Sequence, residues 1–284
     1  MFFQINENTK ILGRFYPTAN NRGLNIYNPY FQEAGINAIY ILFHNPDPKL
    51  LIDGMKGLGL TGAIIAGSFE RDPRVATLID ELHPISQRVK KVGMLINNGG
   101  KITGIYQGAI GLDQSIRKLT DYSDKKIVIM GAGTVVKGLL ALMEMNNSKP
   151  KEVEIYNRTR ENAVLLAREF PFINSVGSLE DMQNRAAGDI FLNATYIGSP
   201  WNKGKDYLFP DSFINRFNYI VDVTFVPIKP QLIEASERLG KQVSPGHRMF
   251  LYQGKYALEN ILRVNIDEEL LSKKMLEDFA TNWS

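Results

Sequence analysis

The stretch that most constrains the fold is residues 126–138, KIVIMGAGTVVKG, where an apolar run breaks at two glycines and then resumes with helical spacing. The apolar residues 127–130 are typical of a short parallel strand that is covered on both faces. Gly131 and Gly133 permit a tight turn and leave backbone N–H groups open at the start of a helix. The segment therefore predicts a buried strand, a turn and a helix N-terminus that is suited to a pyrophosphate.

The third position of the dinucleotide fingerprint G-x-G-x-x-G/A is Val136 in this chain. A side chain of this size would push the helix and the strand slightly apart, and a glycine pattern alone is weak support for a ligand. A glycine turn next to a solvated basic loop is the simpler alternative.

The next predicted strand, residues 152–156, ends in Asn157-Arg158-Thr159-Arg160. An acidic residue there would bind a ribose 2′-hydroxyl, whereas Asn with Arg suits a 2′-phosphate, because guanidinium binds phosphate in bidentate fashion. The sequence therefore favours NADP(H) over NAD(H). The cofactor contacts that we expect from the turn and this loop are Gly131, Ala132, Gly133, Thr134, Asn157, Arg158 and Thr159.

Length and composition limit the partners of the chain. A chain of 284 residues is long enough for two domains, and its net charge of +3 comes from nearly balanced acids and bases. We therefore expect a small-molecule substrate, no nucleic acid and no membrane as partners, and a monomer or a homodimer. The chain has no cysteine, and its 3 histidines lack the close spacing of metal ligands, so we predict no metal site. Residues 1–4 do not resemble a signal peptide, which makes the cytoplasm the default location.

Strand and helix patterns alternate along the chain, which is typical of α/β layers. We expect an N-terminal α/β substrate domain of residues 1–106 with 247–284, and a doubly wound parallel-sheet (Rossmann) domain of residues 107–246. Helices predicted at 249–264 and 268–279 would return to the first domain. The other predicted elements are strands at 10–14, 37–44, 62–66, 190–193 and 219–223, a hairpin of 94–97 and 102–106 around Gly99-Gly100, and helices at 23–34, 48–58, 69–82 and 110–120.

Five motifs follow one another in an order and spacing that resemble the shikimate and quinate dehydrogenase family along nearly the whole chain. The order of the motifs carries the resemblance, since none of them is specific by itself. They are Gly131-Ala132-Gly133, Asn157-Arg158-Thr159, Asn193-Ala194-Thr195 with Gly198, Asp222-x-x-Phe225-x-Pro227, and Gly246-x-x-Met249-x-x-x-Gln253.

This resemblance implies an NADP-dependent dehydrogenase or reductase with its active site in the cleft between the two domains. Such an enzyme transfers a hydride between NADPH and the C3 position of a dehydroshikimate or quinate-type ring. By the same resemblance, Gln253 would bind a substrate hydroxyl. The residues that the resemblance would place against the cofactor are Asn193, Ala194, Thr195, Val223 and Gly246.

The residues that the family uses for proton transfer are absent from this chain. The family's segment around its catalytic lysine reads approximately N-V-T-V-P-F-K, and it falls on residues 64–70 here, which puts Glu70 at the lysine position. The aspartate partner of that lysine falls on Gly108. Family residues that bind the substrate are also replaced: the paired serines fall on Asn21 and Gly23, and an asparagine falls on Val92.

These replacements leave two functions open. The first is an NADP-dependent oxidoreductase that acts on a substrate other than shikimate and uses a changed acid or base. The second is a catalytically silent protein of the same fold that binds NADP(H) or a metabolite as a sensor or partner protein. Because Glu70 inverts the charge of a lysine, a cationic amine or iminium would suit the site better than an anionic ring.

Glu70 and Tyr106 are the candidates for the catalytic acid or base, although a tyrosine that ends a strand also fits simple packing. Asn21 and His247 are candidates for substrate contact, together with Gln253. Asn21 follows the first strand, where an ordinary polar turn is equally consistent, and His247 begins the helix that carries Gln253.

Two further features have structural interpretations. His83 is predicted to cap the C-terminus of the helix at 69–82 and to interact with its dipole. The loop 196–206, which contains Trp201, follows a strand of the cofactor domain and could form a lid over the nicotinamide.

Overall fold

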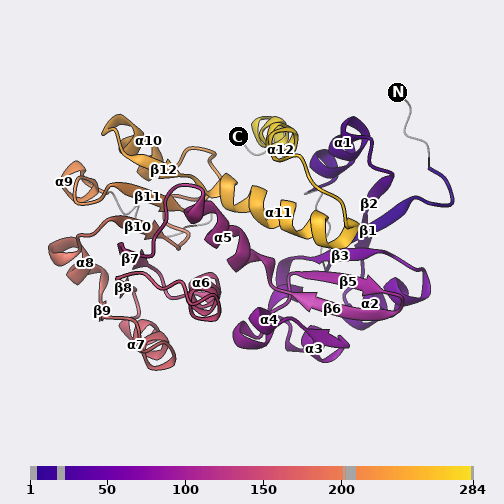
Figure 1. Cartoon of the computed structure of the whole chain (residues 1–284), viewed down its shortest axis with the longest axis horizontal. Coiled ribbons are helices and arrows are strands. Elements are labelled where there is room, and N and C mark those ends of the chain that lie inside the picture. Colours follow the sequence, from indigo (N-terminus) through magenta and orange to yellow (C-terminus); the bar gives the residue numbers. More distant parts are fainter. Residues whose placement is uncertain (1–4, 18–22, 201, 203–208, 283–284) are drawn as a thin grey trace. The chain divides into compact units, whose positions relative to one another are not determined.

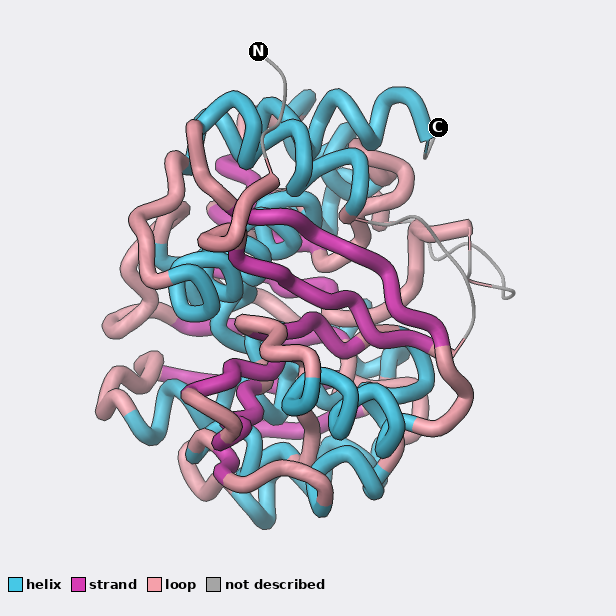
Figure 2. Tube along the Cα trace, turned by 90° about the vertical axis from the view of Figure 1, so that its right-hand side faces the viewer, coloured by secondary structure: helices cyan, strands magenta, loops and turns pink. Residues whose placement is uncertain are grey.

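The computed structural model describes residues 5–17, 23–200, 202 and 209–282. The chain divides into two compact units, each with its own six-stranded sheet (Figure 1). The mixed-sheet unit contains residues 1–107 and 253–282, and the parallel-sheet unit contains residues 108–252. Within each unit, helices flank the strands (Figure 2). The predicted α/β class with a parallel Rossmann-like sheet is confirmed.

The mixed-sheet unit has the strand order β2-β1-β3-β5-β6-β4. Three neighbouring strands of this sheet are parallel. Strand β1 (Lys10–Tyr16) pairs with β2 (Ala38–His44) on one side and with β3 (Gly62–Ile65) on the other. Strand β5 (Met94–Asn98) runs antiparallel to both β3 and β6 (Lys101–Ile105). Its helices are α1 (Leu24–Ala34), α2 (Pro48–Gly57), α3 (Pro73–Thr77), α4 (Pro84–Val89) and α12 (Glu268–Asn282), together with the 3-10 turn η1 (Gly67–Arg71).

Glycines with positive φ define two predicted turns of this unit. Gly99 and Gly100 have φ of 64° and 96°, and they connect β5 to β6 where Asn98 pairs with Lys101. The predicted two-residue hairpin is therefore confirmed, because both central residues adopt the backbone that such a turn requires. Gly35, with φ of 66°, ends α1 as expected.

The single helix predicted for residues 69–82 is wrong, since the segment forms η1, α3 and β4 (Glu81–Leu82) instead. Asp72 is extended, with φ −77° and ψ 113°, because proline disfavours helical backbone at the residue before it. The Asp72 carboxylate accepts a hydrogen bond from the Arg74 N–H at 2.9 Å and so starts a new helix. Strand β4 is fixed from outside the segment, by parallel pairing with β6.

The predicted role of His83 is also wrong. His83 precedes α4, and its Nδ1 accepts a hydrogen bond from the Ile85 N–H at 3.3 Å. It therefore caps the N-terminus of the following helix, whose first residue is Pro84.

The parallel-sheet unit has the strand order β12-β11-β10-β7-β8-β9, and all of these pairings are parallel. The predicted central strand is β7 (Lys126–Met130), in which residues 127–130 are fully buried. The other strands are β8 (Glu152–Tyr156), β9 (Ser175–Gly177), β10 (Ile190–Asn193), β11 (Tyr219–Asp222) and β12 (Gln242–Ser244). The helices are α5 (Gln107–Arg117), α6 (Thr134–Met145), α7 (Arg160–Glu169), α8 (Leu179–Arg185), α9 (Asp211–Ile214), α10 (Gln231–Arg238) and the start of α11 (Gly246–Leu262).

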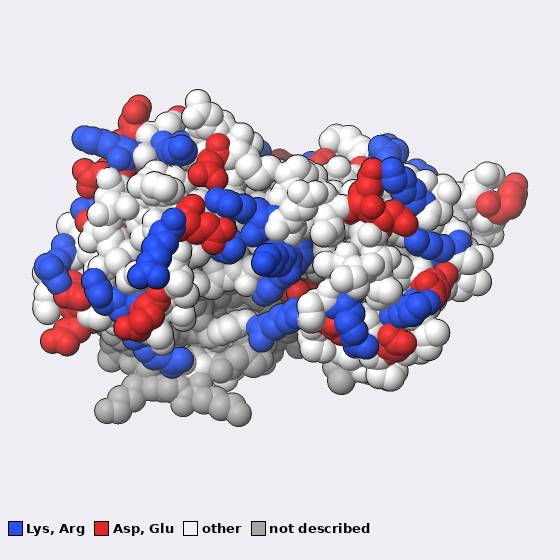
Figure 3. Space-filling model, turned by 90° about the horizontal axis from the view of Figure 1, so that it is seen from below, with Lys and Arg blue, Asp and Glu red and all other residues white. Residues whose placement is uncertain are grey.

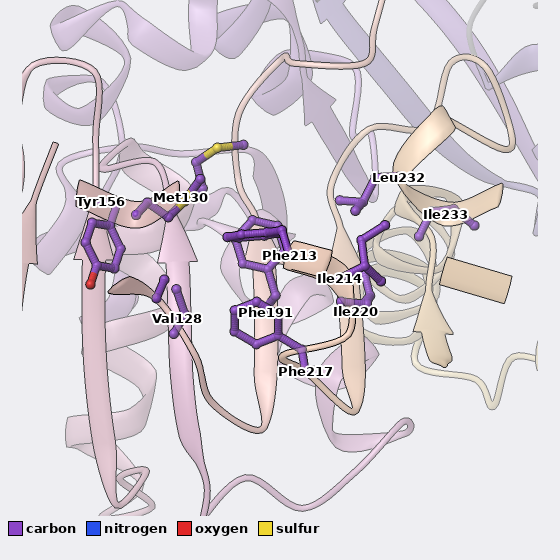
Figure 4. Packing of buried hydrophobic residues seen from close by; sticks show 12 residues of the cluster. Val128, Met130, Tyr156, Phe191, Phe213, Ile214, Phe217, Ile220, Leu232 and Ile233 are labelled. Carbon is purple, nitrogen blue, oxygen red and sulfur yellow. The ribbon is translucent and has the colours of Figure 1, made fainter. Parts of the chain in front are cut away.

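An aromatic cluster forms the core on one face of this sheet (Figure 4). The Phe191 ring packs against Phe213 and Phe217, with centroids 5.1 and 5.3 Å apart. These edge-on and tilted contacts anchor β10 against the segment that begins with α9. The packing therefore fixes the position of β10, whose carboxyl end lies at the edge where parallel sheets bind their ligands.

The C-terminal helices pack on the mixed-sheet unit, as predicted. Helix α12 contacts α1 (Figure 1). The Asp267 N–H, just before α12, donates to the Tyr30 hydroxyl of α1 at 2.9 Å. Lys10 Nζ of β1 donates to the Leu262 carbonyl at the end of α11.

Candidate functional site

The turn after β7 has the geometry that the glycine pattern predicts. Gly131 has φ of 116°, and a Cβ added to it would lie 2.8 Å from the Ala194 carbonyl oxygen. Only glycine fits there without displacing backbone. Gly133 is the N-cap of α6 and supplies no side-chain cap, so the N–H groups of the first turn point outward without a side-chain acceptor. Such a helix start suits an anion, since its N–H groups and dipole are both directed at it.

A pocket of about 340 Å³ opens beside this turn. It brings together six residues that the sequence nominated for the cofactor: Ala132, Gly133, Asn157, Arg158, Thr159 and Thr195. The six other nominated residues do not line it: Gly131, Thr134, Asn193, Ala194, Val223 and Gly246. Of the remaining lining residues, three belong to the loop 196–206 that the sequence nominated as a lid, Tyr196, Ile197 and Asn202, and two were not predicted, Asn162 and Leu179.

Of the two unpredicted lining residues, Asn162 carried a usable signal. It lies three positions after Thr159 at the start of α7, so helical spacing places the two residues on one face. Leu179 starts α8 and Ile197 follows β10, and both are ordinary apolar residues far from the turn in sequence. Their place in the pocket depends on how the chain returns to this edge of the sheet.

Arg158 is exposed at the pocket wall, in the loop after β8. Asn157 fixes the shape of this loop: its backbone N–H donates to the Gly177 carbonyl at 3.1 Å, and its side-chain amide donates to the Thr159 carbonyl at 2.8 Å. The loop is thus tied to the neighbouring strand β9 and to the start of α7. A guanidinium held at this position can bind an anion that enters the pocket.

A buried polar network ties the ends of β10 and β11 together. Asn193 and Asp222 are 0% and 1% exposed, and the Asn193 side-chain amide donates to Asp222 Oδ1 at 3.1 Å. The Thr224 N–H donates to the same oxygen at 2.8 Å. Asp222 Oδ2 is buried without a hydrogen-bond partner. Burial raises the pKa of Asp222 to about 7, although the hydrogen bonds from Thr224 and Asn193 oppose this rise.

The same network reaches the pocket wall. Asn193 Oδ1 accepts hydrogen bonds from the Thr195 hydroxyl at 2.7 Å and from the Thr195 N–H at 3.1 Å. The Asn193 amide also donates to the Ile197 carbonyl at 3.1 Å. Thr195 and Ile197 line the pocket, whereas Asn193 does not. The hydrogen bonds of Asn193 therefore fix the positions of these two lining residues.

Val223 and Gly246 were nominated for the cofactor but have clear packing roles. The Val223 N–H donates to the Asn193 carbonyl at 3.0 Å and continues the pairing of β10 with β11. A Cβ on Gly246 would come within 2.3 Å of the Thr224 carbonyl oxygen. Close backbone approach is therefore sufficient to explain the glycine, whether or not it also contacts a cofactor.

In the mixed-sheet unit, the candidates for proton transfer lie at one sheet edge. Glu70 is exposed in η1, directly after β3, and Tyr106 is 9% exposed directly after β6. Gly93 joins the two strand ends, since its carbonyl accepts from the Ile65 N–H and its N–H donates to the Ile105 carbonyl, both at 2.9 Å. The buried Gln107 side-chain amide donates to the Gly93 carbonyl at 3.1 Å.

The sequence suggested that Glu70 puts a negative charge where related proteins have a lysine. The structure adds two cations to the surroundings of Glu70. Lys91, two residues before Gly93, interacts electrostatically with both Glu70 and Arg71. Burial, assisted by Arg71, lowers the pKa of the Lys91 ammonium, whereas Glu70 raises it. The two cations offset the carboxylate, so a preference for a cationic substrate does not follow from Glu70 alone.

The three candidates for substrate contact differ in how they are placed. Asn21 lies outside the described residues, as does Trp201 of the proposed lid. Gln253 is half-buried in α11. His247 is half-buried at the start of α11, and its Nδ1 has no hydrogen-bond partner. Burial, with Arg248 and Lys229 nearby, lowers the pKa of His247.

Two features are absent from the part of the chain that the structure describes. None of its helices has the length and apolar character needed to cross a membrane. It also contains no group of three or more His, Cys, Asp and Glu side chains arranged to hold a metal ion. On the face shown in Figure 3, acidic and basic side chains are interspersed over both units.

Comparison with known proteins gives a consistent result. The family model described as shikimate / quinate 5-dehydrogenase matches residues 113–207. The shikimate dehydrogenase (NADP(+)) of Pyrococcus abyssi is 26% identical over 92% of this chain and 95% of its own length. The shikimate dehydrogenase-like protein of Haemophilus influenzae is 26% identical over 95% of this chain and 96% of its own.

Solved structures share the fold over nearly the whole chain. A shikimate 5-dehydrogenase-like protein has a TM-score of 0.85 at 23% identity, covering 96% of this chain and 98% of its own. A shikimate dehydrogenase in complex with NADP+ has a TM-score of 0.81 at 24% identity, covering 97% of each chain. The shikimate 5-dehydrogenase of Listeria monocytogenes, in complex with shikimate and NAD, has a TM-score of 0.81 at 22% identity, covering 96% of this chain and 98% of its own. The chain is therefore similar in sequence to shikimate dehydrogenases over nearly its whole length, and it shares their fold.

Proposed function

We propose that this protein is an NADP(H)-dependent oxidoreductase of the shikimate and quinate dehydrogenase family that acts on a substrate other than shikimate. The observation that carries this proposal is the pocket beside the glycine turn, which is lined both by Gly133 at an uncapped helix start and by Arg158. The parallel-sheet unit would bind the cofactor and the mixed-sheet unit the substrate. We take residues 107–246 as the cofactor domain, and residues 1–106 with 247–284 as the substrate domain.

The residues of the pocket fit a dinucleotide phosphate. The Gly131 turn brings backbone close to the space where a pyrophosphate would lie, and the first N–H groups of α6 would hold it. Arg158 and Asn157 would bind the 2′-phosphate of NADP(H), because a guanidinium offers parallel N–H donors to phosphate oxygens. The bound cofactor would supply or accept the hydride.

The relatives and neighbours explain why the substrate is proposed to differ. The related proteins include a shikimate dehydrogenase (NADP(+)) and a shikimate 5-dehydrogenase that was solved in complex with shikimate and NAD. In this chain the positions that resemble the family's proton-transfer pair are Glu70 and Gly108, and its substrate-binding positions are largely replaced. Glu70 and Tyr106 remain candidates for the acid or base, and Asn21, Gln253 and His247 remain candidates for substrate contact.

The cofactor preference is tested by titrating the protein with NADPH and with NADH and following nucleotide fluorescence. We expect Arg158→Gln to weaken NADPH binding about tenfold to a hundredfold, since a hydrogen bond to a charged group contributes roughly 1.5–3 kcal/mol. NADH binding should not change. Arg160→Gln is the matched control, because Arg160 is an exposed arginine two positions away that does not line the pocket.

The oxidoreductase activity itself is tested by following NADPH absorbance over a panel of cyclic and open-chain ketones and imines, and by NADP+ reduction with shikimate and quinate. Turnover of any panel compound above that of shikimate supports the proposal. Tight NADPH binding without turnover would favour the alternative, a catalytically silent sensor or partner protein, which the replacements at Glu70 and Gly108 make a specific competitor. Binding curves that stay flat for both nucleotides would contradict the oxidoreductase and leave only a sensor that binds another metabolite.

A further inference from the structure

We propose that Lys91 is the proton-transferring residue of this enzyme, at the edge of the mixed sheet where β3 and β6 end. This inference rests on the function proposed above. Lys91 belongs to none of the motifs named above, and it does not line the pocket.

The topology places Lys91 where several strand ends meet. It precedes β5, and Gly93, two residues later, hydrogen-bonds to the last residue of β3 and the last residue of β6. The carboxyl end of β1 reaches the same edge, because the Ala66 N–H donates to the Phe15 carbonyl at 3.0 Å. Lys91 therefore lies with Glu70 and Tyr106 at the edge where parallel strands β1 and β3 end, which is where open α/β sheets bind ligands.

The chemical setting of Lys91 differs from that of its neighbour Lys90. Lys90 is exposed, whereas Lys91 is half-buried. The charged groups that act on Lys91 are the Glu70 carboxylate, which favours the ammonium, and the Arg71 guanidinium, which opposes it. An ammonium that is partly withdrawn from water and lies next to a second cation gives up its proton more readily than an exposed one.

The other groups at this edge are less suited to the task. Tyr106 is nearly buried at the end of its strand, and Glu70 is exposed and carries a carboxylate, which repels negative charge that develops on a substrate oxygen. An ammonium can donate a proton and also stabilise negative charge on oxygen. Lys91 is thus the group at this edge that meets both requirements.

The proposed step is balanced in atoms and charge. In the reducing direction the substrate carbonyl carbon gains a C–H bond from the hydride of the reduced nucleotide, and the C=O π electrons move to oxygen. The Lys91 N–H bond breaks as the new O–H bond forms, so the carbonyl becomes an alcohol and the lysine a neutral amine. The amine regains its proton from water. In the oxidising direction the same amine accepts the alcohol proton.

A test that needs no substrate is ¹³C reductive methylation of the lysines followed by NMR titration, with signals assigned through K91Q and K90Q. We expect the Lys91 signal to titrate at lower pH than the Lys90 signal. Glu70→Gln should lower that midpoint further, because it removes the charge that favours the ammonium, and Arg71→Gln should raise it. A Lys91 signal that titrates together with Lys90 and ignores both substitutions overturns the proposal.

The kinetic test uses the panel compound that the wild-type protein turns over fastest. Lys91→Gln and Lys91→Arg should each lower kcat about 100-fold or more, with the NADPH Kd unchanged, since arginine keeps the positive charge but does not give up its proton. Lys90→Gln should retain the wild-type rate. Unchanged kcat in K91Q would overturn the role of Lys91 and leave the proposed function standing. NADPH binding without turnover of any compound by the wild type would overturn both.

Discussion

Replacing Asp222 by Asn should change how the stability of the protein depends on pH. Asp222 is 1% exposed, and its Oδ2 has no hydrogen-bond partner. Asn keeps an acceptor for the Asn193 amide and the Thr224 N–H and stays neutral at every pH. The variant therefore mimics the protonated carboxyl and removes only the titration.

The sign and the size of the effect follow from the pKa. Burial raises the pKa of Asp222 from its usual 3.8 to about 7 in the folded protein. Because the folded state binds the proton more tightly than the unfolded state, the stabilisation is complete below pH 3.8 and is lost as the pH rises through 7. Each pKa unit corresponds to about 1.36 kcal/mol, so the whole loss amounts to about 4 kcal/mol.

The assay is urea unfolding at a series of pH values from 4 to 9, followed by circular dichroism, for the wild type and D222N. We expect the free energy of unfolding of the wild type to fall relative to D222N across the window from pH 4 to 7 and to stay level above it. Asp211→Asn is the control: the Arg238 hydrogen bond lowers the pKa of the exposed Asp211, so its contribution changes only below pH 3.8. A difference curve for D222N that is flat between pH 4 and 8 would refute the reasoning.

Two further substitutions probe the packing of the parallel-sheet unit. Gly131→Ala should lower the free energy of unfolding by about 1–3 kcal/mol, because φ is 116° and the new Cβ would meet the Ala194 oxygen at 2.8 Å; urea unfolding measures the loss, and an unchanged midpoint would contradict it. Tyr122→Phe should cost about 1–3 kcal/mol in the same assay, since the buried Tyr122 hydroxyl donates to the Asp113 carboxylate, which would be left short of a donor. If the free energy of unfolding falls by less than the scatter of repeated measurements, the Asp113 carboxylate has found another partner.

Local sequence patterns were sufficient to predict those elements that depend on interactions between residues close together in the sequence. The apolar run 127–130 followed by two glycines specifies a strand, a turn and a helix, because apolar spacing and glycine backbone freedom act over a few residues. The basic loop at Asn157-Arg158-Thr159 follows from the end of the next strand in a parallel sheet, and it lies on the pocket as expected. The glycine hairpin at residues 99–100 is determined in the same way.

The fold of residues 69–82 shows where local patterns fail. Their apolar spacing fits one helix, but Pro73 prevents a helical residue before it, and β4 exists only because β6 lies beside it. Strand pairing depends on residues that are distant in the sequence, so periodicity within the segment does not reveal it.

The chain alone thus determined the class of the fold, the glycine turn and the basic loop beside it, because each depends on neighbours in sequence. Only the tertiary structure decided which residues surround them. Leu179 and Ile197 come to the pocket from separate segments, burial gives Asp222 its raised pKa, and Lys91 meets Glu70 and Arg71 at a sheet edge. The physical reason is that burial and electrostatic environment are set by atoms that the chain brings together only when it folds.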